Sequence, residues 1–208
     1  MEIKERIIQE ASGLFAKNGI RSITMDDIAR HMGISKRTIY ENFRDKDEIV
    51  HLCIEANKQE QRQCKRAAVA TSSNVLEAIY LIMFEVATQM DQINPAFITD
   101  LRKYHHKLWK ESAIKHQEEH IKDLRKLIVK GIEDGIFRDV INVEIITRML
   151  NLQLSEITNE ESFPSELFSR SDVFVNIIIN FTRGIATPKG IKIIEKIIEQ
   201  KKLQHNQQ

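Results

Sequence analysis

Apolar residues along this chain recur every three or four positions, which is the spacing of the buried face of an α-helix. Strand-like alternation of apolar and polar residues is hard to find, and the 208 residues include only seven Gly and three Pro. The pattern therefore predicts an all-α protein. The first predicted helix covers residues 2–18, ends at Gly19 and carries one apolar stripe made of Ile3, Ile7, Ala11, Leu14 and Phe15.

Residues 24–43 predict two short helices joined by a tight turn. Thr24 is followed three residues later by Asp27, which is the spacing of a capping box at a helix start. Gly33 then stands where a sharp turn needs a positive φ, and Ser35 can cap the second helix. This layout is typical of a helix-turn-helix, whose second helix enters the major groove of DNA.

The second helix of this pair has an inner and an outer side. Ile39 and Phe43, one turn apart, face inward, which places Arg37 and Glu41 on the opposite side. Arg37 could fork onto a guanine, and Glu41 could accept from a cytosine amino group. An alternative is that these two side chains simply pair with each other, because they are four residues apart. Helix pairs joined by Gly also occur in proteins that never touch DNA.

Charge changes this picture only locally. The formal net charge is +1, so the whole-chain basic signature of a nucleic-acid-binding protein is absent. Residues 30–46 nevertheless hold five Lys or Arg against two acids. Just beyond, Asp45 and Glu48 form a second capping pattern, which places Lys46 at a helix N-terminus as a natural phosphate contact.

With these features the chain resembles the TetR (tetracycline-repressor-like) family of transcriptional regulators. The resemblance covers about the first quarter of the chain. It implies a three-helix helix-turn-helix DNA-binding domain at residues 1–47 and a helical ligand-binding and dimerisation domain at residues 48–208, linked by a helix over about residues 45–70. The residues that carry it are Phe15, Gly19, Thr24, Ile28, Ala29, Gly33, Ile34, Ser35, Thr38, Ile39, Tyr40, Phe43, Lys46 and Glu48.

The resemblance also implies a function, that of a sequence-specific repressor which a small-molecule effector releases from a palindromic operator. Asn42 stands where family members often have histidine and Arg37 where they often have a small residue, so the target sequence is open. By resemblance, phosphate contacts are expected from Thr24, Ser35, Tyr40, Asn42 and Lys46, and base-facing roles from Lys36, Arg37 and Thr38.

The rest of the chain predicts further apolar helices, over about residues 75–90, from Pro95 through Trp109, and over 112–134. Their aromatic residues and methionines could line an effector pocket, as the family's second domain would require. At helical spacing the same side chains are equally compatible with ordinary core. The candidate pocket residues are Met83, Phe84, Met90, Phe97, Tyr104 and Trp109.

Two later helices, over about residues 142–157 and 168–181, carry more apolar surface than one subunit can bury. This excess predicts a homodimer interface, and the resemblance implies a four-helix arrangement of these elements. The alternative is an internal core. The candidate interface residues are Met149, Leu152, Phe174, Ile177, Ile178 and Phe181. A last amphipathic helix over about residues 190–203 could pack on the preceding helix or recruit a partner, and its role is open.

Other chemistries are weakly supported. His116, Glu119 and His120 fit an H-x-x-E-H zinc pattern, but the surroundings are dense in charge and a third ligand is not evident. We therefore expect no metal, no cofactor and no enzymatic activity. The two rival hypotheses are a helical protein-interaction module that does not bind DNA, and a metal-binding sensor or enzyme using His116 and His120.

Three features of the sequence bear on where the protein is located in the cell. The charged N-terminus lacks an apolar signal core, and no apolar run approaches membrane-spanning length. Cys53 and Cys64 lie eleven residues apart on one predicted helix, about 16 Å along its axis, which is too far for a disulfide. We expect a cytoplasmic protein with two reduced, partly buried thiols and no membrane partner.

Overall fold

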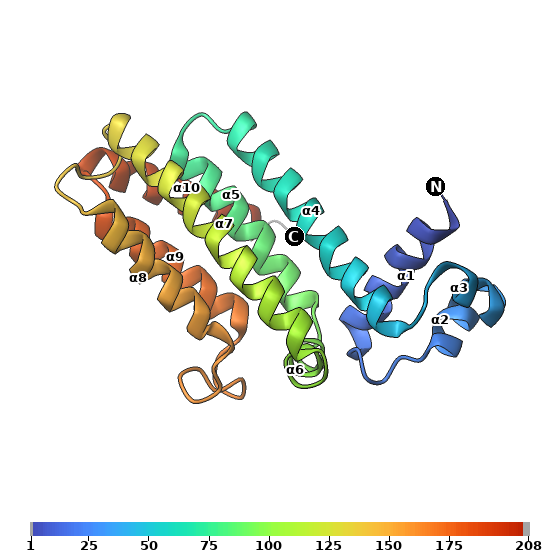
Figure 1. Cartoon of the computed structure of the whole chain (residues 1–208). Helices are drawn as coiled ribbons and strands as arrows, with labels where there is room; N and C mark the ends of the chain where they lie inside the picture. The colour runs from blue at the N-terminus through green and yellow to red at the C-terminus, as the bar shows by residue number, and fades with distance from the viewer. Residues whose placement is uncertain (1, 206–208) are drawn as a thin grey trace. The chain divides into compact units, whose positions relative to one another are not determined.

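The computed structural model describes the backbone of residues 2–205 and their side chains except those of 111–117, 202, 204 and 205. Within this part of the chain, the regular structure is helical apart from one isolated antiparallel bridge between Phe137 and Ala186. The predicted all-α class is therefore confirmed. The elements, shown in Figure 1, are α1 (Ile3–Asn18), α2 (Met25–Met32), α3 (Lys36–Asn42), α4 (Lys46–Thr71), α5 (Val75–Gln92), α6 (Pro95–Tyr104), α7 (His106–Glu133), α8 (Val143–Ser155), the 3-10 turn η1 (Glu156–Thr158), α9 (Arg170–Ile185) and α10 (Pro188–His205).

Tertiary contacts divide the chain into two compact units. Unit 1 consists of Met1–Gln63 and Gln92–Ile114, and unit 2 of Cys64–Asp91 and Lys115–Gln208. Along the chain, the boundary is crossed inside α4, at the end of α5 and inside α7. None of the helices in the described part of the chain is both long enough and apolar enough to cross a bilayer.

Unit 1 is built around the first three helices. The stripe of α1 packs behind α2 and α3, as predicted, and its members Ile7, Ala11 and Phe15 are fully buried. Ile3, predicted for the same stripe, is 37% exposed because it lies in the first turn of α1, at the edge of this core. Ile28 of α2 and Ile39 of α3 complete the centre of the cluster.

Helix α6 belongs to unit 1. Asn94 caps it by accepting from the backbone N–H of Ala96 at 2.9 Å, and the backbone N–H of Asn94 donates to the carbonyl of Ala16 in α1 at 2.8 Å. Leu101 of α6 is buried in the unit 1 core. Helical spacing identifies an apolar face but not the element it packs on, and the predicted domain boundary at residue 48 stays a prediction.

The end of α6 also differs from the sequence expectation. The predicted helix ran through Trp109, whereas α6 stops at Tyr104, and Trp109 lies in the first turns of α7. The backbone breaks at His105, whose φ of −120° and ψ of 40° are not helical. No Gly or Pro marks this break, so the sequence carried no local signal for it.

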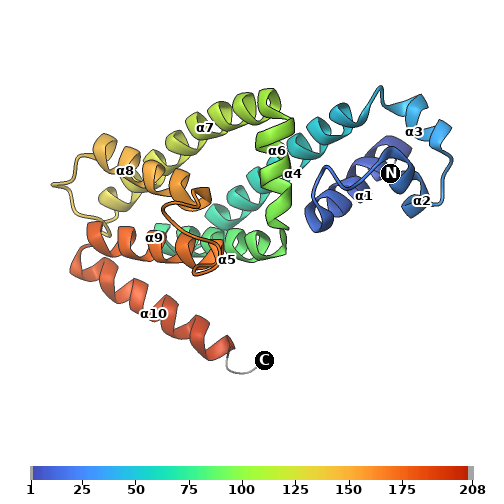
Figure 2. The same ribbon diagram turned by 90° about the horizontal axis from the view of Figure 1, so that it is seen from below.

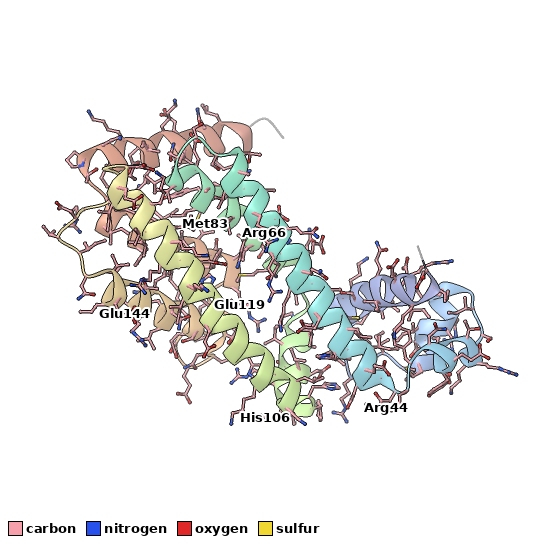
Figure 3. All side chains as sticks on the ribbon, turned by 45° about the horizontal axis from the view of Figure 1, so that its top comes forward. Arg44, Arg66, Met83, His106, Glu119 and Glu144 are labelled. Atoms are coloured by element: carbon pink, nitrogen blue, oxygen red, sulfur yellow. The ribbon has the colours of Figure 1, made fainter. Side chains whose placement is uncertain are left out.

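Unit 2 is a helical core formed by α5, α7, α8, α9 and α10. Met83, labelled on α5 in Figure 3, is 1% exposed, and Ile128 of α7 is fully buried beside it in one cluster. Helices α8 and α9 lie side by side (Figure 1), and α9 also contacts α10 (Figure 2). The C-terminal helix is part of this core, because Ile194 of α10 is fully buried in it.

A close approach fixes the start of α10. The backbone N–H of Thr187 donates to the carbonyl of Ile136 at 2.9 Å. A Cβ added at Gly190 would stand 2.4 Å from that same carbonyl oxygen, which no side chain tolerates. The absence of a side chain at Gly190 therefore lets α10 begin directly against the end of α7 and its following turn.

Candidate nucleic-acid interface

Helix α2 and its turn have the predicted capping geometry. The hydroxyl of Thr24 accepts from the backbone N–H of Asp27 at 3.1 Å, and the Asp27 carboxylate accepts from the backbone N–H of Thr24 at 3.0 Å. The Thr24 hydroxyl also donates to that carboxylate, and these hydrogen bonds hold the pKa of Asp27 below its ordinary value. Gly33 ends α2 in the left-handed conformation with φ of 65°, as the sequence required.

Helix α3 presents two distinct faces. Ser35 caps it, and Ile39 and Phe43 point inward and are 0% and 2% exposed. On the opposite side, the Arg37 side chain is 88% exposed, and Tyr40 is 49% exposed. Because the inner face packs in the core, the outer face is held in a fixed orientation and can enter the major groove of DNA.

Lys36 stands at the first position of α3 and bridges to α2. Its ammonium Nζ lies 2.7 Å from Oδ1 of Asp26, and 6.0 Å from the centroid of the Tyr40 ring. The hydrogen bond to Asp26 raises the pKa of Lys36, so this side chain is charged at any physiological pH. Both partners are about half exposed, so the pair is open to exchange with another anion.

Two further cations of this surface are paired within their own segments. Nε of Arg37 donates to Oε1 of Glu41 at 2.9 Å, so the alternative in which these two residues pair is realised in the DNA-free chain. Arg44 lies in the connection just before α4 (Figure 3), and its Nε donates to Oδ2 of Asp45 at 2.8 Å. This hydrogen bond lowers the pKa of Asp45.

Like the capping hydroxyls of Thr24 and Ser35, two more of the expected phosphate ligands are engaged inside the chain. Nζ of Lys46 donates to the carbonyl of Ile20 at 2.5 Å and lies 5.8 Å from the centroid of the Phe15 ring, and burial lowers its pKa. Nδ2 of Asn42 donates to the carbonyl of Thr38 at 2.8 Å. Their phosphate contacts remain predictions that require each side chain to change partner.

Sequence reasoning gave no role to three charged residues of this region. Asp26 faces Lys36, Arg44 stands at the start of α4, and Lys4 of α1 places its Nζ 5.3 Å from the Phe43 ring centroid. Arg44 is one of the five Lys or Arg of residues 30–46, so the local excess of positive charge could have identified it as a candidate DNA contact. Lys4 lies far from Phe43 in sequence, so only the fold reveals that the two are neighbours.

The predicted effector-pocket residues are divided between the two units. Met83, Phe84 and Met90 lie on α5 in unit 2, where they belong to or pack against its core, whereas Phe97, Tyr104 and Trp109 lie in unit 1. Tyr104 is 45% exposed, and its hydroxyl accepts from Nη1 of Arg21 at 2.8 Å. The pocket remains a prediction.

The predicted dimer residues fall into two groups. Met149 and Leu152 of α8 are 50% and 64% exposed. Phe174 and Ile178 of α9 are each 8% exposed, because they pack in the core of their own chain. The remaining two candidates, Ile177 and Phe181, are partly buried against the same core.

Metal and thiol chemistry receive no support from the described side chains. The side chain of His116 lies outside them, and they hold no group of three or more His, Cys, Asp or Glu able to bind a metal ion. Both cysteines are free thiols, but Cys53 is buried and Cys64 is exposed, whereas the sequence suggested partial burial of both. Burial raises the pKa of Cys53 to about 12, so its thiol stays protonated and unreactive.

Comparison with known proteins agrees with this geometry. The profile of a family described as "Bacterial regulatory proteins, tetR family" matches residues 7–53, which contain most of α1, all of α2 and α3, and the start of α4. An uncharacterised HTH-type transcriptional regulator of Bacillus subtilis, YvaF, is 33% identical over 106 residues. That alignment spans 50% of this chain and 55% of the relative, which is about half of each protein.

Two further similarities extend beyond the N-terminal helices. The HTH-type transcriptional repressor KstR2 of Mycobacterium tuberculosis is 25% identical over 148 residues, covering 69% of this chain and 74% of the repressor. A transcriptional regulator structure from Cytophaga hutchinsonii superposes with a TM-score of 0.71 at 17% identity, covering 88% of this chain and 98% of that one. At such low identity the superposition establishes the fold alone.

Proposed function

Because this chain belongs to the TetR family of bacterial regulatory proteins, we propose that it is a dimeric, sequence-specific DNA-binding repressor released from its operator by a small molecule. The family consists of transcriptional regulators, which agrees with the prediction that the chain is not an enzyme. The observation that carries the proposal is the two-faced helix α3. Its inner residue Ile39 is fully buried, and its outer residue Arg37 has an 88% exposed side chain.

In the proposed complex, α3 enters the major groove and Arg37 forks onto the O6 and N7 atoms of a guanine. Arg37 must leave Glu41 to do so, and Glu41 is then available to accept from a cytosine amino group. The N-terminal turns of α2 and α3, beginning at Thr24 and Ser35, aim backbone N–H groups at phosphates of the flanking strand. Phosphate contacts fix the register, and base contacts supply the specificity.

Dimerisation is supported by an exposed apolar stripe on α8. Ile145, Met149 and Leu152 recur at helical spacing and are 55%, 50% and 64% exposed, which is unusual for neighbouring large apolar side chains. A twofold dimer joined through this stripe would present two copies of α3 to one DNA face. It predicts a palindromic operator whose half-sites lie about 34 Å apart or a multiple of that distance.

We propose an apolar effector, because the core of unit 2 is apolar with few buried hydroxyl groups. The hydroxyl of Tyr80 on α5 lies 3.2 Å from Oγ1 of Thr182 on α9 within that core. A solved structure of KstR2 is described as a ketosteroid transcriptional regulator, so a relative of this chain is linked to an apolar class of molecule. An effector acts only if it binds one conformation of the dimer more tightly than another.

Connectivity supports a route for this coupling. The chain crosses from one unit to the other inside α4 and inside α7, so each of these helices contributes residues to both units. A shift of either helix would therefore move residues in both units. Helix α6, which precedes α7 in the sequence, is held in unit 1 by the hydrogen bonds from Asn94 to α1. A movement of α7 on effector binding would therefore pull on α6 and, through it, on the DNA-binding helices.

The proposal is tested by replacing Arg37. The probe is a duplex that the wild-type protein selects from a random-sequence pool, compared with a scrambled duplex of equal composition. We expect R37A to weaken binding to the selected duplex about 10- to 100-fold and to relax specificity at one base pair in each half-site. The matched control is K130A, which removes a cation of α7 from a similar i,i+4 pair with Asp134, the residue after the end of that helix. Unchanged binding and specificity in R37A would contradict the role of α3.

A further inference from the structure

The surface proposed to meet DNA is self-neutralised in the free protein. The exposed cations Lys36, Arg37 and Arg44 each lie within ion-pair distance of an acid of the same chain, at 2.7, 2.9 and 2.8 Å. Two of these pairs are formed by residues close in sequence. The third, between Lys36 and Asp26, joins the first turn of α2 to the first residue of α3.

The position of Asp26 distinguishes it from the other two acids. It is the second residue of α2, next to the turn where Thr24 is expected to meet a phosphate, and its side chain is 51% exposed. The capping box of α2 uses Asp27, so the helix start does not depend on Asp26. The carboxylate of Asp26 therefore stands close to where a DNA phosphate would lie and holds Lys36 as that phosphate would.

The other acids have evident structural roles. Asp45 accepts from the backbone N–H of Glu48 at 2.8 Å and so caps α4. Glu41 pairs with Arg37 within α3, one turn along the same helix. Such i,i+4 pairs are common on exposed helices and support the helix itself. Asp26 differs from both, because it does not cap its helix and its ion pair reaches Lys36 on the neighbouring helix.

We propose that Asp26 is a specificity-determining residue that competes with DNA for Lys36, an inference that rests on the proposed function. Binding to arbitrary DNA comes almost entirely from attraction between cations and phosphates. Asp26 weakens this binding twice, because it occupies Lys36 and because it repels the nearby phosphate. On the operator, Lys36 leaves Asp26 and binds a well-placed acceptor on a base or phosphate. This new contact with DNA compensates for the loss of the ion pair with Asp26.

The consequence is a larger ratio between operator affinity and affinity for arbitrary DNA. That ratio decides occupancy in a cell, because arbitrary sites far outnumber operators. The Tyr40 ring lies beside this pair, with its centroid 6.0 Å from the Lys36 ammonium. Asp26 thus suppresses unproductive binding without contacting a base.

The test compares wild type and D26N on the selected and scrambled duplexes at two salt concentrations. We expect D26N to bind the scrambled duplex about fivefold more tightly and the selected duplex less than about twofold more tightly, so that the specificity ratio falls. The salt dependence on scrambled DNA should steepen by about one unit in the log–log slope per subunit, because one more phosphate is neutralised.

Two further variants separate this account from a general charge effect. E10Q removes the same charge from a half-exposed acid of α1, which lies 3.1 Å from His31 near the C-terminal end of α2, and should leave the ratio unchanged. In a K36Q background, D26N should no longer alter the ratio, since the competition needs Lys36. Thermal melts of each variant establish that the fold is kept.

The outcomes are distinguishable. A wild type that does not prefer its selected duplex contradicts the proposed function and this inference with it. A wild type that does prefer it, with a D26N variant that keeps the same ratio, contradicts this inference alone. The inference also fails if D26N tightens both duplexes equally, or if its effect persists in the K36Q background.

Discussion

The backbone N–H of Arg21 donates a hydrogen bond to Oδ2 of Asp100 at 2.7 Å, although the two residues are 79 positions apart in sequence. The Arg21 guanidinium also donates to the Tyr104 hydroxyl and lies 5.1 Å from the centroid of that ring. A Cβ added at Gly19 would stand 3.0 Å from the Cβ of Ala96, so the turn after α1 and the start of α6 approach closely. Together these contacts form one corner of unit 1.

Removing the acceptor at this corner should loosen α6. We expect D100A to lower the free energy of unfolding of unit 1 by about 1 kcal/mol, because the Arg21 N–H loses its charged partner. Hydrogen exchange of the Arg21 amide and of the backbone of residues 95–104 measures the effect. T99A, at the neighbouring exposed position of α6, should change these rates little. Equal exchange in D100A and wild type would show that the contact does not hold α6.

Two single substitutions of glycine, compared with each other, test the backbone conformation of the helix-turn-helix. Gly33 has φ of 65° and open space around its Cα, so G33A meets no clash but forces a left-handed alanine. We expect it to destabilise unit 1 by about 1 kcal/mol. Gly13 lies inside α1 with equally open surroundings, so G13A should stabilise the same unit by about 0.5 to 1 kcal/mol. Denaturation midpoints that shift in the same direction would contradict this reasoning.

The carboxylate of Asp27, which caps α2, makes the free energy of unfolding depend on pH in the acidic range. Hydrogen bonds from Thr24 hold the pKa of Asp27 below its ordinary value of 3.8. A depressed folded-state pKa contributes stability that is present above the unfolded-state pKa and lost as pH falls through the folded-state pKa. We therefore expect wild type to lose stability below about pH 4 more steeply than D27N, which is already less stable at pH 7.

Urea titrations followed by circular dichroism from pH 7 to pH 2.5 would measure this difference. Two curves that remain parallel throughout that range would contradict the role of the Asp27 carboxylate. E10Q is the control, because Glu10 is a half-exposed acid outside the capping box of α2, and its replacement should leave the acid dependence of the wild type in place.

The exposed stripe of α8 predicts the effect of charge on assembly. If subunits pair through this stripe as proposed, M149E combined with L152E should give a monomer, because two carboxylates per subunit would be buried in the apolar interface. Sedimentation equilibrium measures the change in mass. The control is L81E, since Leu81 on α5 is 51% exposed and lies outside the stripe. A doubly substituted protein that remains dimeric would place the interface elsewhere.

Much of the helix-turn-helix could be predicted from sequence because its determinants are local. Thr24, Gly33 and Ser35 each act on backbone groups within three or four residues, so their spacing is readable in the chain. The burial of Ile39 and Phe43 follows from their separation of one helical turn. These local rules also fixed the outward direction of Arg37.

The contacts that sequence reasoning missed join distant segments. The ion pair of Asp26 with Lys36 and the hydrogen bond of Lys46 to Ile20 depend on how helices pack, which periodicity does not encode. Phe97 and Trp109 have the spacing of an apolar face, but that spacing cannot tell a pocket wall from the core of unit 1, against which they pack. The same limit applies to Phe174, because its spacing does not distinguish a subunit interface from the core of its own chain, in which it packs, and its interface role stays a prediction.

Selection from a random-sequence duplex pool with the wild-type protein would test whether α3 reads a DNA sequence as part of a twofold dimer. We expect enrichment of one sequence with two inverted half-sites, whose centres lie about 34 Å apart or a multiple of that distance. Binding to that sequence should exceed binding to a scrambled duplex by at least about a thousandfold and should weaken with salt. A folded dimer that enriches no sequence would contradict this role of α3.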